Sequence, residues 1–373
     1  MNRKFAPRLV LSAAIIGLAP VAVSAQGAGG TSDNTGYGTT TAEFLLLGAN
    51  ARGTALGGSY IAVATEVGGL NANPAATALM TRPGAQFSQY DYVGETKLNW
   101  GAIAFPFGGG ARAFGIQVGT FGFSDQPVYT AAEPDGTGEL YSVSETFAAL
   151  TFAQNFSDRF SVGFTAKGVF DQLGQASGSA FAVDFGTHFH SNLSGRPIRF
   201  AFTLANLGTK LTYDGERLRT DAARDPIPGQ DGITEEPQPA RFRTTPFSLP
   251  TVFRVGLAYD VVSQANSRVT LMGEFNQMNS NKAGFGFGAE LAAMRLGGTG
   301  FGVAARGSWT AYPAENYDED FTGLTLEKEK SPGLALGAGI NYQTPTFSLG
   351  FDYAWKTMGL LGDTNFFTVS LGW

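Results

Sequence analysis

The chain has 373 residues and a formal net charge of −6 at pH 7, and only 15% of its residues are charged, against about 25% in ordinary soluble domains. Cysteine is absent, which excludes disulfides, a cysteine nucleophile, a thiolate metal site and a lipid-anchored N-terminal cysteine. The negative charge and the lack of a basic face argue against nucleic acid as a partner.

The first 25 residues have the features of a secretory signal peptide. Their start is basic, an apolar stretch runs from Leu9 to Val23, and Ala25 ends a run of small residues suited to cleavage. A membrane anchor is the alternative, but roughly 15 apolar residues are short for a hydrocarbon core of about 30 Å. We expect residues 1–25 to be removed and residues 26–41, rich in Gly, Ser and Thr, to form a flexible periplasmic lead-in.

Residues 42–82 do not alternate as a strand does. The pair Gly57-Gly58, many small residues and the Asn73-Pro74 turn predict short helices and tight turns that pack closely against another element.

From residue 83 to 373 the chain is a series of segments of about ten residues in which every second residue is apolar or aromatic, as in barrel strands. Ten clean segments follow residue 160, and four less regular ones lie near 84–92, 97–107, 111–121 and 145–156. They predict an all-β transmembrane antiparallel barrel of about fourteen strands. Such a barrel is too wide for its wall side chains to fill, so we expect residues 42–82 to lie in the lumen as a hatch.

The connections support this count. Those after even-numbered strands are short, and the long ones, residues 124–144, 207–247 and 312–331, follow odd-numbered strands. Long loops on one side are typical of a barrel in a Gram-negative outer membrane, where they face the outside. A soluble β-sandwich or β-helix is the alternative, but neither requires long connections on alternate turns only.

The residues predicted to face the lumen are polar and nearly balanced in charge. They include Asp260, Lys356 and the candidates Lys167, Asp184, His188, Arg199, Arg254, Glu274, Glu290, Arg306 and Asp352. Ion pairs that hold hatch and wall together explain them, because buried charges must be paired; a solute pathway is the alternative. Inward glycines are interpreted as leaving space in the lumen.

No motif of a known enzyme class is present, and we predict neither catalysis nor a cofactor nor a metal. His188 and His190 share a strand face with Asp184 and are a conceivable metal pair, but a polar patch near the periplasmic rim explains them more simply. An acidic cluster in the last long loop is interpreted as a solvated loop, with a divalent cation as the alternative. Its members are Glu315, Asp318, Glu319 and Asp320.

The chain ends on an alternating aromatic and apolar strand. Its outward residues are Phe367, Val369, Leu371 and Trp373. The pattern resembles the C-terminal signal by which the barrel-assembly machinery recognises outer-membrane barrels, although Phe is the commoner last residue. We therefore expect the assembly machinery and outer-membrane lipid to be partners.

Three stretches resemble the PorV/PorQ family, which is itself similar to FadL-type outer-membrane transporters. They are Leu56–Ala64 with the Asn73-Pro74-Ala75 turn, Asn206–Gly215, and Leu249–Gly256. The likeness spans residues 42–373 and implies a fourteen-stranded barrel with an N-terminal hatch. Ala72 departs from the aromatic of many relatives, and the connection 218–247 is particular to this chain.

The resemblance implies two functions. PorV-like members serve type IX secretion by binding the C-terminal signal domain of secreted cargo, and this export role, with cargo on the long loops, is the first expectation. FadL-like members instead take up hydrophobic small molecules passively, which is the alternative. A purely structural barrel is the third hypothesis.

Overall fold

The computed structural model describes residues 36, 38–222, 238–311 and 333–373. The signal peptide, most of the lead-in, part of the connection after the seventh strand, and the acidic cluster from Glu315 to Asp320 lie outside these residues. Within the described residues, no helix is both long and apolar enough to cross a membrane.

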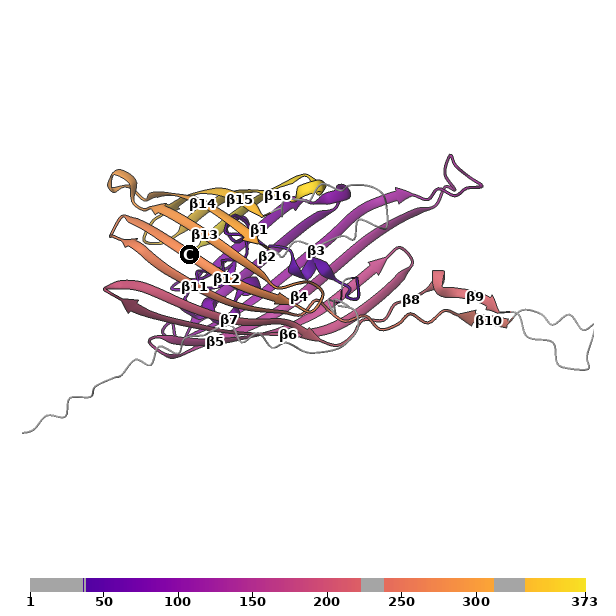
Figure 1. The fold of residues 1–373 in the computed structure, drawn as a ribbon, viewed down its shortest axis with the longest axis horizontal. Coiled ribbons are helices and arrows are strands. Elements are labelled where there is room, and N and C mark those ends of the chain that lie inside the picture. The colour runs from indigo at the N-terminus through magenta and orange to yellow at the C-terminus, as the bar shows by residue number, and fades with distance from the viewer. Residues whose placement is uncertain (1–35, 37, 223–237, 312–332) are drawn as a thin grey trace, which may run out of the picture. The chain divides into compact units, whose positions relative to one another are not determined.

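Fourteen strands form one closed antiparallel barrel, as the alternation predicts (Figure 1). They are β1 Gly84–Asp91, β2 Lys97–Phe107, β3 Arg112–Pro127, β4 Leu140–Ser157, β5 Phe160–Leu173, β6 Ala176–Leu193, β7 Arg196–Gly208, β11 Val252–Ser263, β12 Ser267–Met278, β13 Gly284–Ala293, β14 Phe301–Ala311, β15 Leu334–Gln343, β16 Ser348–Thr357 and β17 Asp363–Gly372. Each strand pairs with its neighbours in the chain, and β17 pairs with β1 to close the ring. No strand edge of this ring is left open to lipid.

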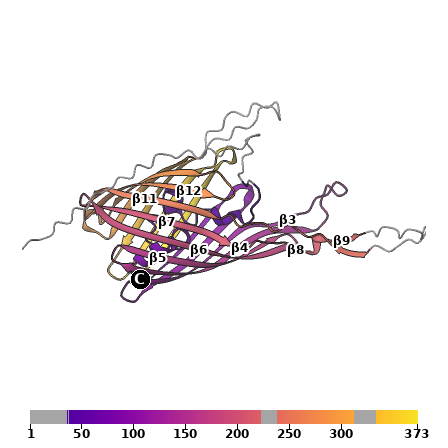
Figure 2. The ribbon, with the colours of Figure 1, turned by 60° about the horizontal axis from the view of Figure 1, so that its bottom comes forward.

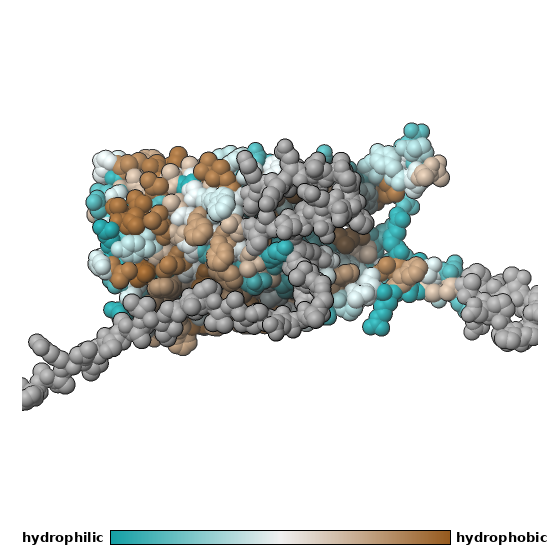
Figure 3. Space-filling view, viewed as in Figure 1, coloured by the Kyte–Doolittle hydropathy of each residue, from teal (hydrophilic) through white to brown (hydrophobic). Residues whose placement is uncertain are grey.

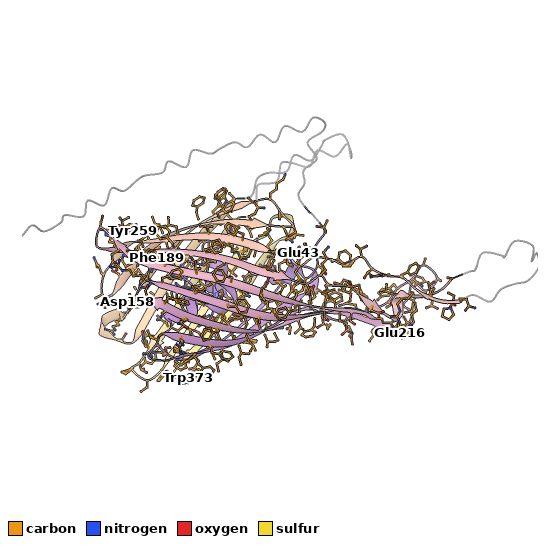
Figure 4. All side chains as sticks on the ribbon, turned by 90° about the horizontal axis from the view of Figure 1, so that it is seen from below. Glu43, Asp158, Phe189, Glu216, Tyr259 and Trp373 are labelled. Carbon is orange, nitrogen blue, oxygen red and sulfur yellow. The ribbon has the colours of Figure 1, made fainter. Side chains whose placement is uncertain are left out.

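All the connections at one end of the barrel are short. Asp158, in the turn between β4 and β5, and Tyr259 of β11 lie at this end in Figure 4, while Glu43 lies toward the other. The connection after β5, Gly174–Gln175, is also short, although it belongs to the opposite end. By the rule for outer-membrane barrels, the end with Asp158 faces the periplasm.

Strands β3 to β6 are longer than the alternation predicts. They have 14 to 18 residues, whereas β11 to β17 have 10 to 12. The connection between β3 and β4 is therefore shorter than the expected 124–144. The extra length lies at the outer end (Figures 1 and 2).

The connection after β7 contains further strands, β8 Asp214–Gly215, β9 Arg219–Ala222 and β10 Gln238–Arg241. The backbone of β8 pairs with the start of β6, and β9 pairs with β10. Short 3-10 helices, η3 Val93–Glu95, η4 Glu216–Leu218, η5 Leu296–Gly298 and η7 Gly359–Leu361, lie between strands.

The described part of the lead-in does not lie at the periplasmic end. Thr41 N donates to Ser248 O at 3.1 Å, and its hydroxyl lies 2.6 Å from the hydroxyl of Tyr213. Both partners belong to the connection between β7 and β11, at the outer end. These hydrogen bonds tie Thr41 to an outer connection, whereas a periplasmic position was expected for residues 26–41.

The wall is apolar outside and polar inside. Outward side chains such as Phe164, Leu257, Phe287 and Ile340 are 43–57% exposed, whereas inward charges are buried. Apolar residues cover much of the wall visible in Figure 3. The outward face of β17 follows the same pattern, with Phe367, Val369, Leu371 and Trp373 all exposed. This is the reverse of a soluble protein and is typical of a barrel in lipid.

Leu257 lies midway along β11 on the lipid face. We predict that Leu257→Arg destabilises the barrel by about 2–4 kcal/mol, because a charge in the hydrocarbon core lacks a partner. Urea unfolding in phospholipid bilayers measures this change, with Leu257→Met as the control of similar volume. Equal stability of the two variants would contradict the assignment of this face to lipid.

Candidate functional site

The N-terminal segment (residues 42–82) forms four short helices in the barrel. They are η1 Glu43–Leu46, α1 Ala51–Ala55, α2 Gly69–Ala72 and η2 Pro74–Leu79. Asn50 caps α1, since its side-chain oxygen accepts a hydrogen bond from Gly53 N at 2.7 Å. Gly57 and Gly58 follow with φ of 40° and 72°, a left-handed backbone that favours glycine. The chain therefore turns sharply here.

Asn73 ties the segment to itself and to the wall. Its side-chain oxygen accepts from Ala75 N at 3.1 Å, and its amide donates to the carbonyls of Ile61 and Thr187, each at 3.1 Å. Pro74 then begins η2, a position where its missing N–H removes no helical hydrogen bond. Asn73 thus joins two turns of the segment to strand β6.

Inward glycines of the wall allow the segment to approach it closely. A Cβ atom at Gly163 would overlap the backbone of Pro74 and Ala75, and one at Gly286 would overlap that of Gly58. The space that these glycines leave in the lumen is therefore occupied by the N-terminal segment. Figures 1 and 2 show the segment, in indigo, within the ring of strands.

Glu290 of β13 is the centre of an ion-pair cluster that links the segment to the wall. Its carboxylate contacts Arg52 Nε at 2.8 Å, Arg306 Nε at 2.7 Å and an Nη of Arg268 at 3.0 Å. Arg306 also contacts Asp352 at 2.5 Å. The Glu290 side chain is 3% exposed, so these partners offset its desolvation. The structure thus brings together the candidates Glu290, Arg306 and Asp352.

Arg52 is the segment's own member of this cluster. Besides Glu290 it binds Glu66 at 2.5 Å, and Glu66 also accepts a hydrogen bond from the Tyr60 hydroxyl. Burial by itself would lower the pKa of Arg52, but the carboxylates of Glu290 and Glu66 raise it well above its ordinary value. Burial and Glu66 likewise raise the pKa of Tyr60. Both side chains therefore keep their protons across the physiological range.

Lys167 and Asp184 form a second buried pair at 2.9 Å. Asn206 completes it, since Lys167 Nζ donates to its side chain at 2.6 Å and its own N–H donates to Asp184 at 2.8 Å. Asn206 has a φ of 61° and lies where the register of β6 and β7 shifts. Its side-chain amide also donates to Pro250 O at 3.1 Å, and these three contacts hold the β-bulge in place.

Three further candidates, Arg199, Arg254 and Glu274, take part in two ion pairs across strands. Arg199 of β7 binds Asp260 of β11. Arg254 lies 4.0 Å from Glu274, and Glu274 also accepts a hydrogen bond from Ile61 N at 3.1 Å. This second pair thus contacts the N-terminal segment as well.

His188 contacts the segment and forms no metal site. Its Nε2 lies 3.1 Å from the carbonyl oxygen of Ala62, and its ring centroid is 6.1 Å from that of His190. Asp184 pairs with Lys167 instead of a histidine. Among the described residues, no group of three His, Asp or Glu side chains has the spacing of a metal site.

Two cavities lie on opposite sides of the N-terminal segment. The inner cavity of about 390 Å³ is lined by Arg52, Pro83 and Gly372, near the periplasmic end. The outer cavity of about 210 Å³ is lined by Leu45, Tyr92 and other residues near the outer end. The segment contributes residues to the lining of both cavities.

Aromatic side chains around the outer cavity are missed by the sequence analysis. Phe44 stacks on Phe121, with ring centroids 6.2 Å apart, and Tyr90 lies 3.8 Å from Phe366. Tyr90 and Phe366 line the cavity and are buried. The adjacent Phe366-Phe367 pair was a usable signal, because neighbours in a strand point to opposite faces.

The barrel resembles solved structures of hydrocarbon channels. The CymD monoaromatic hydrocarbon channel is 12% identical, with 88% of this chain and 97% of that one covered and a TM-score of 0.50. The toluene transporters TodX of Pseudomonas putida and TbuX of Ralstonia pickettii are each 10% identical, with 87% and 97% covered and TM-scores of 0.50. These likenesses show a shared fold, and nothing in them is specific to PorV/PorQ.

No family model matches the chain, and no curated protein sequence matches it.

We predict that Arg52→Met loosens the N-terminal segment without unfolding the barrel, because Glu290 keeps Arg268 and Arg306 as partners. Charge-assisted hydrogen bonds contribute about 1.5–3 kcal/mol, so amide hydrogen exchange in α1 should accelerate about tenfold or more. Mass spectrometry of the exchanged barrel measures this. Arg217→Met, which breaks an exposed pair with Glu139, is the control and should change nothing in α1. Unchanged exchange in Arg52→Met would show that packing alone holds the segment.

Proposed function

We propose that the barrel carries small hydrophobic molecules passively across the outer membrane and that the N-terminal segment is its hatch. The observation that carries this proposal is the pair of cavities inside one closed wall, both lined in part by the segment. A molecule that enters from the outside reaches the outer cavity first. Movement of the segment then connects it with the inner cavity and the periplasm.

The sequence predicts a polar lumen, but the outer cavity has an apolar and aromatic part that suits an apolar ligand. Tyr90, Tyr92, Phe366 and Leu45 line it, and burial of apolar surface against such side chains favours a hydrophobic molecule. The inward charges predicted from the sequence are largely paired with one another, so they do not exclude an apolar solute. The solved structures that share the fold include a monoaromatic hydrocarbon channel and a toluene transporter, which is consistent with this role.

The export hypothesis is carried by the sequence resemblance alone. Nothing in the comparisons supports it, and residues 223–237 of the connection after β7, on which cargo binding was expected, lie outside the described residues. We therefore place uptake first.

An engineered disulfide tests the hatch, because the chain has no cysteine of its own. A Cβ atom at Gly57 would lie 3.3 Å from that of Ser308 in β14, near the lower end of the range in disulfides, about 3.5–4.5 Å. We predict that oxidised Gly57→Cys/Ser308→Cys loses most of the uptake of radiolabelled toluene by intact cells and that a reductant restores it.

The two single-cysteine variants are the controls, and both should transport under oxidising and reducing conditions alike. Mass spectrometry of the purified barrel establishes that the bond has formed. Uptake by the oxidised double variant at the rate of the reduced one would refute a moving hatch. Uptake by cells with the native barrel no faster than by cells without it would refute transport itself.

A further inference from the structure

Cations outnumber carboxylates around both cavities. The inner cavity is lined by five arginines and three carboxylates, and the outer one by Lys167, Arg254, Lys356 and one carboxylate, Glu274. The two cavities together have eight lining cations and four lining carboxylates. Asp184 and Asp260 pair with lining residues, and counting them still leaves two more cations than carboxylates. The whole chain has the opposite balance, with 31 acidic and 25 basic residues. The linings of these two cavities are thus positive inside a negative protein.

Lys356 is the uncompensated cation of the outer cavity. Lys167 has Asp184 at 2.9 Å and Arg254 has Glu274 at 4.0 Å. Within the part of the chain that the structure describes, no carboxylate and no hydrogen-bond acceptor contacts the Lys356 ammonium, although its side chain is partly buried. A cation that is partly withdrawn from water and has no counter-ion is unfavourable. An anionic ligand in this cavity relieves that cost.

The other residues of the outer cavity indicate what the uncharged part of such a ligand is. Tyr90, Tyr92 and Phe366 present aromatic rings, which favour a flat apolar group by stacking and edge contacts. The volume of about 210 Å³ is below the roughly 300–1,000 Å³ of sites for drug-sized molecules. The space therefore suits one ring with a small substituent.

We propose that the outer cavity binds a single-ring organic carboxylate, with its ring among Tyr90, Tyr92 and Phe366 and its carboxylate on Lys356. This inference rests on the proposed function and narrows the solute from a neutral hydrocarbon to an anion. Arg254 is the second cation that the cavity offers, since its contact with Glu274 is long. The excess of arginine in the inner cavity then attracts the same anion once the hatch moves, because low-dielectric walls focus the field of unbalanced charges.

Equilibrium dialysis of the full-length barrel in detergent tests the site, with radiolabelled benzoate and toluene as separate probes and protein-free micelles as the blank. We expect the native barrel to bind both probes. Lys356→Met should weaken benzoate binding about tenfold or more, because a charge-assisted hydrogen bond is lost, and should leave toluene binding unchanged. Lys356→Arg keeps the charge and should retain benzoate.

Lys97→Met is the matched control, since Lys97 is an exposed lysine that lines neither cavity. It should bind both probes as the native barrel does. Toluene binding by Lys356→Met shows that its cavity is intact, so a loss confined to benzoate does not come from misfolding. Two results would overturn the anion site and leave the proposed function standing. One is that Lys356→Met binds benzoate as strongly as the native barrel does, and the other is that the native barrel binds toluene but not benzoate. Binding of neither probe by the native barrel would count against both.

Discussion

The pairing of β17 with β1 is the contact on which the whole barrel depends. It runs from Gly84 opposite Gly372 to Tyr90 opposite Phe366, and without it two strand edges would meet lipid with unpaired N–H and C=O groups. The last residues of the chain therefore close the ring. Once the ring is closed, every strand must divide its side chains between lipid and lumen, which imposes the strict alternation along the wall.

Closing a ring of fourteen strands creates an interior that wall side chains do not fill, and the N-terminal segment occupies it by two means. Where wall glycines such as Gly163 and Gly286 face it, backbone packs against backbone. Where charges face it, Arg52 and the N–H of Ile61 bind Glu290 and Glu274 of the wall. Close packing fits the shape of the N-terminal segment to the wall. The polar contacts fix the position of the segment, because a buried charge tolerates few alternative arrangements.

The wall could be predicted from the sequence because its signal is local. The alternation of apolar and polar residues is visible within a segment of about ten residues. The number of strands, the exposed face of β17 and the inward charges could therefore all be predicted from the sequence. Partners could not be predicted, since Arg52 and Glu290 are 238 residues apart. The aromatic lining was missed because the outer end of β1 reverses the usual order: Tyr90 faces inward and is buried, while Gln89 and Asp91 are exposed. Aromatic residues that face the lumen recur at every second position, as do those that face lipid. Periodicity alone therefore does not distinguish the lumen face of a strand from its lipid face.

The arrangement of charges also bears on whether the segment can move. Breaking a buried ion pair is costly when it leaves a charge alone. Separation of Arg52 from Glu290 leaves neither alone, because Glu290 keeps Arg268 and Arg306, and Arg52 keeps Glu66 on its own segment. Glu274 likewise retains Arg254 when Ile61 withdraws. Each side of the interface thus carries its own neutralising partners, so the segment and the wall can part at a smaller electrostatic cost than their shared cluster first suggests.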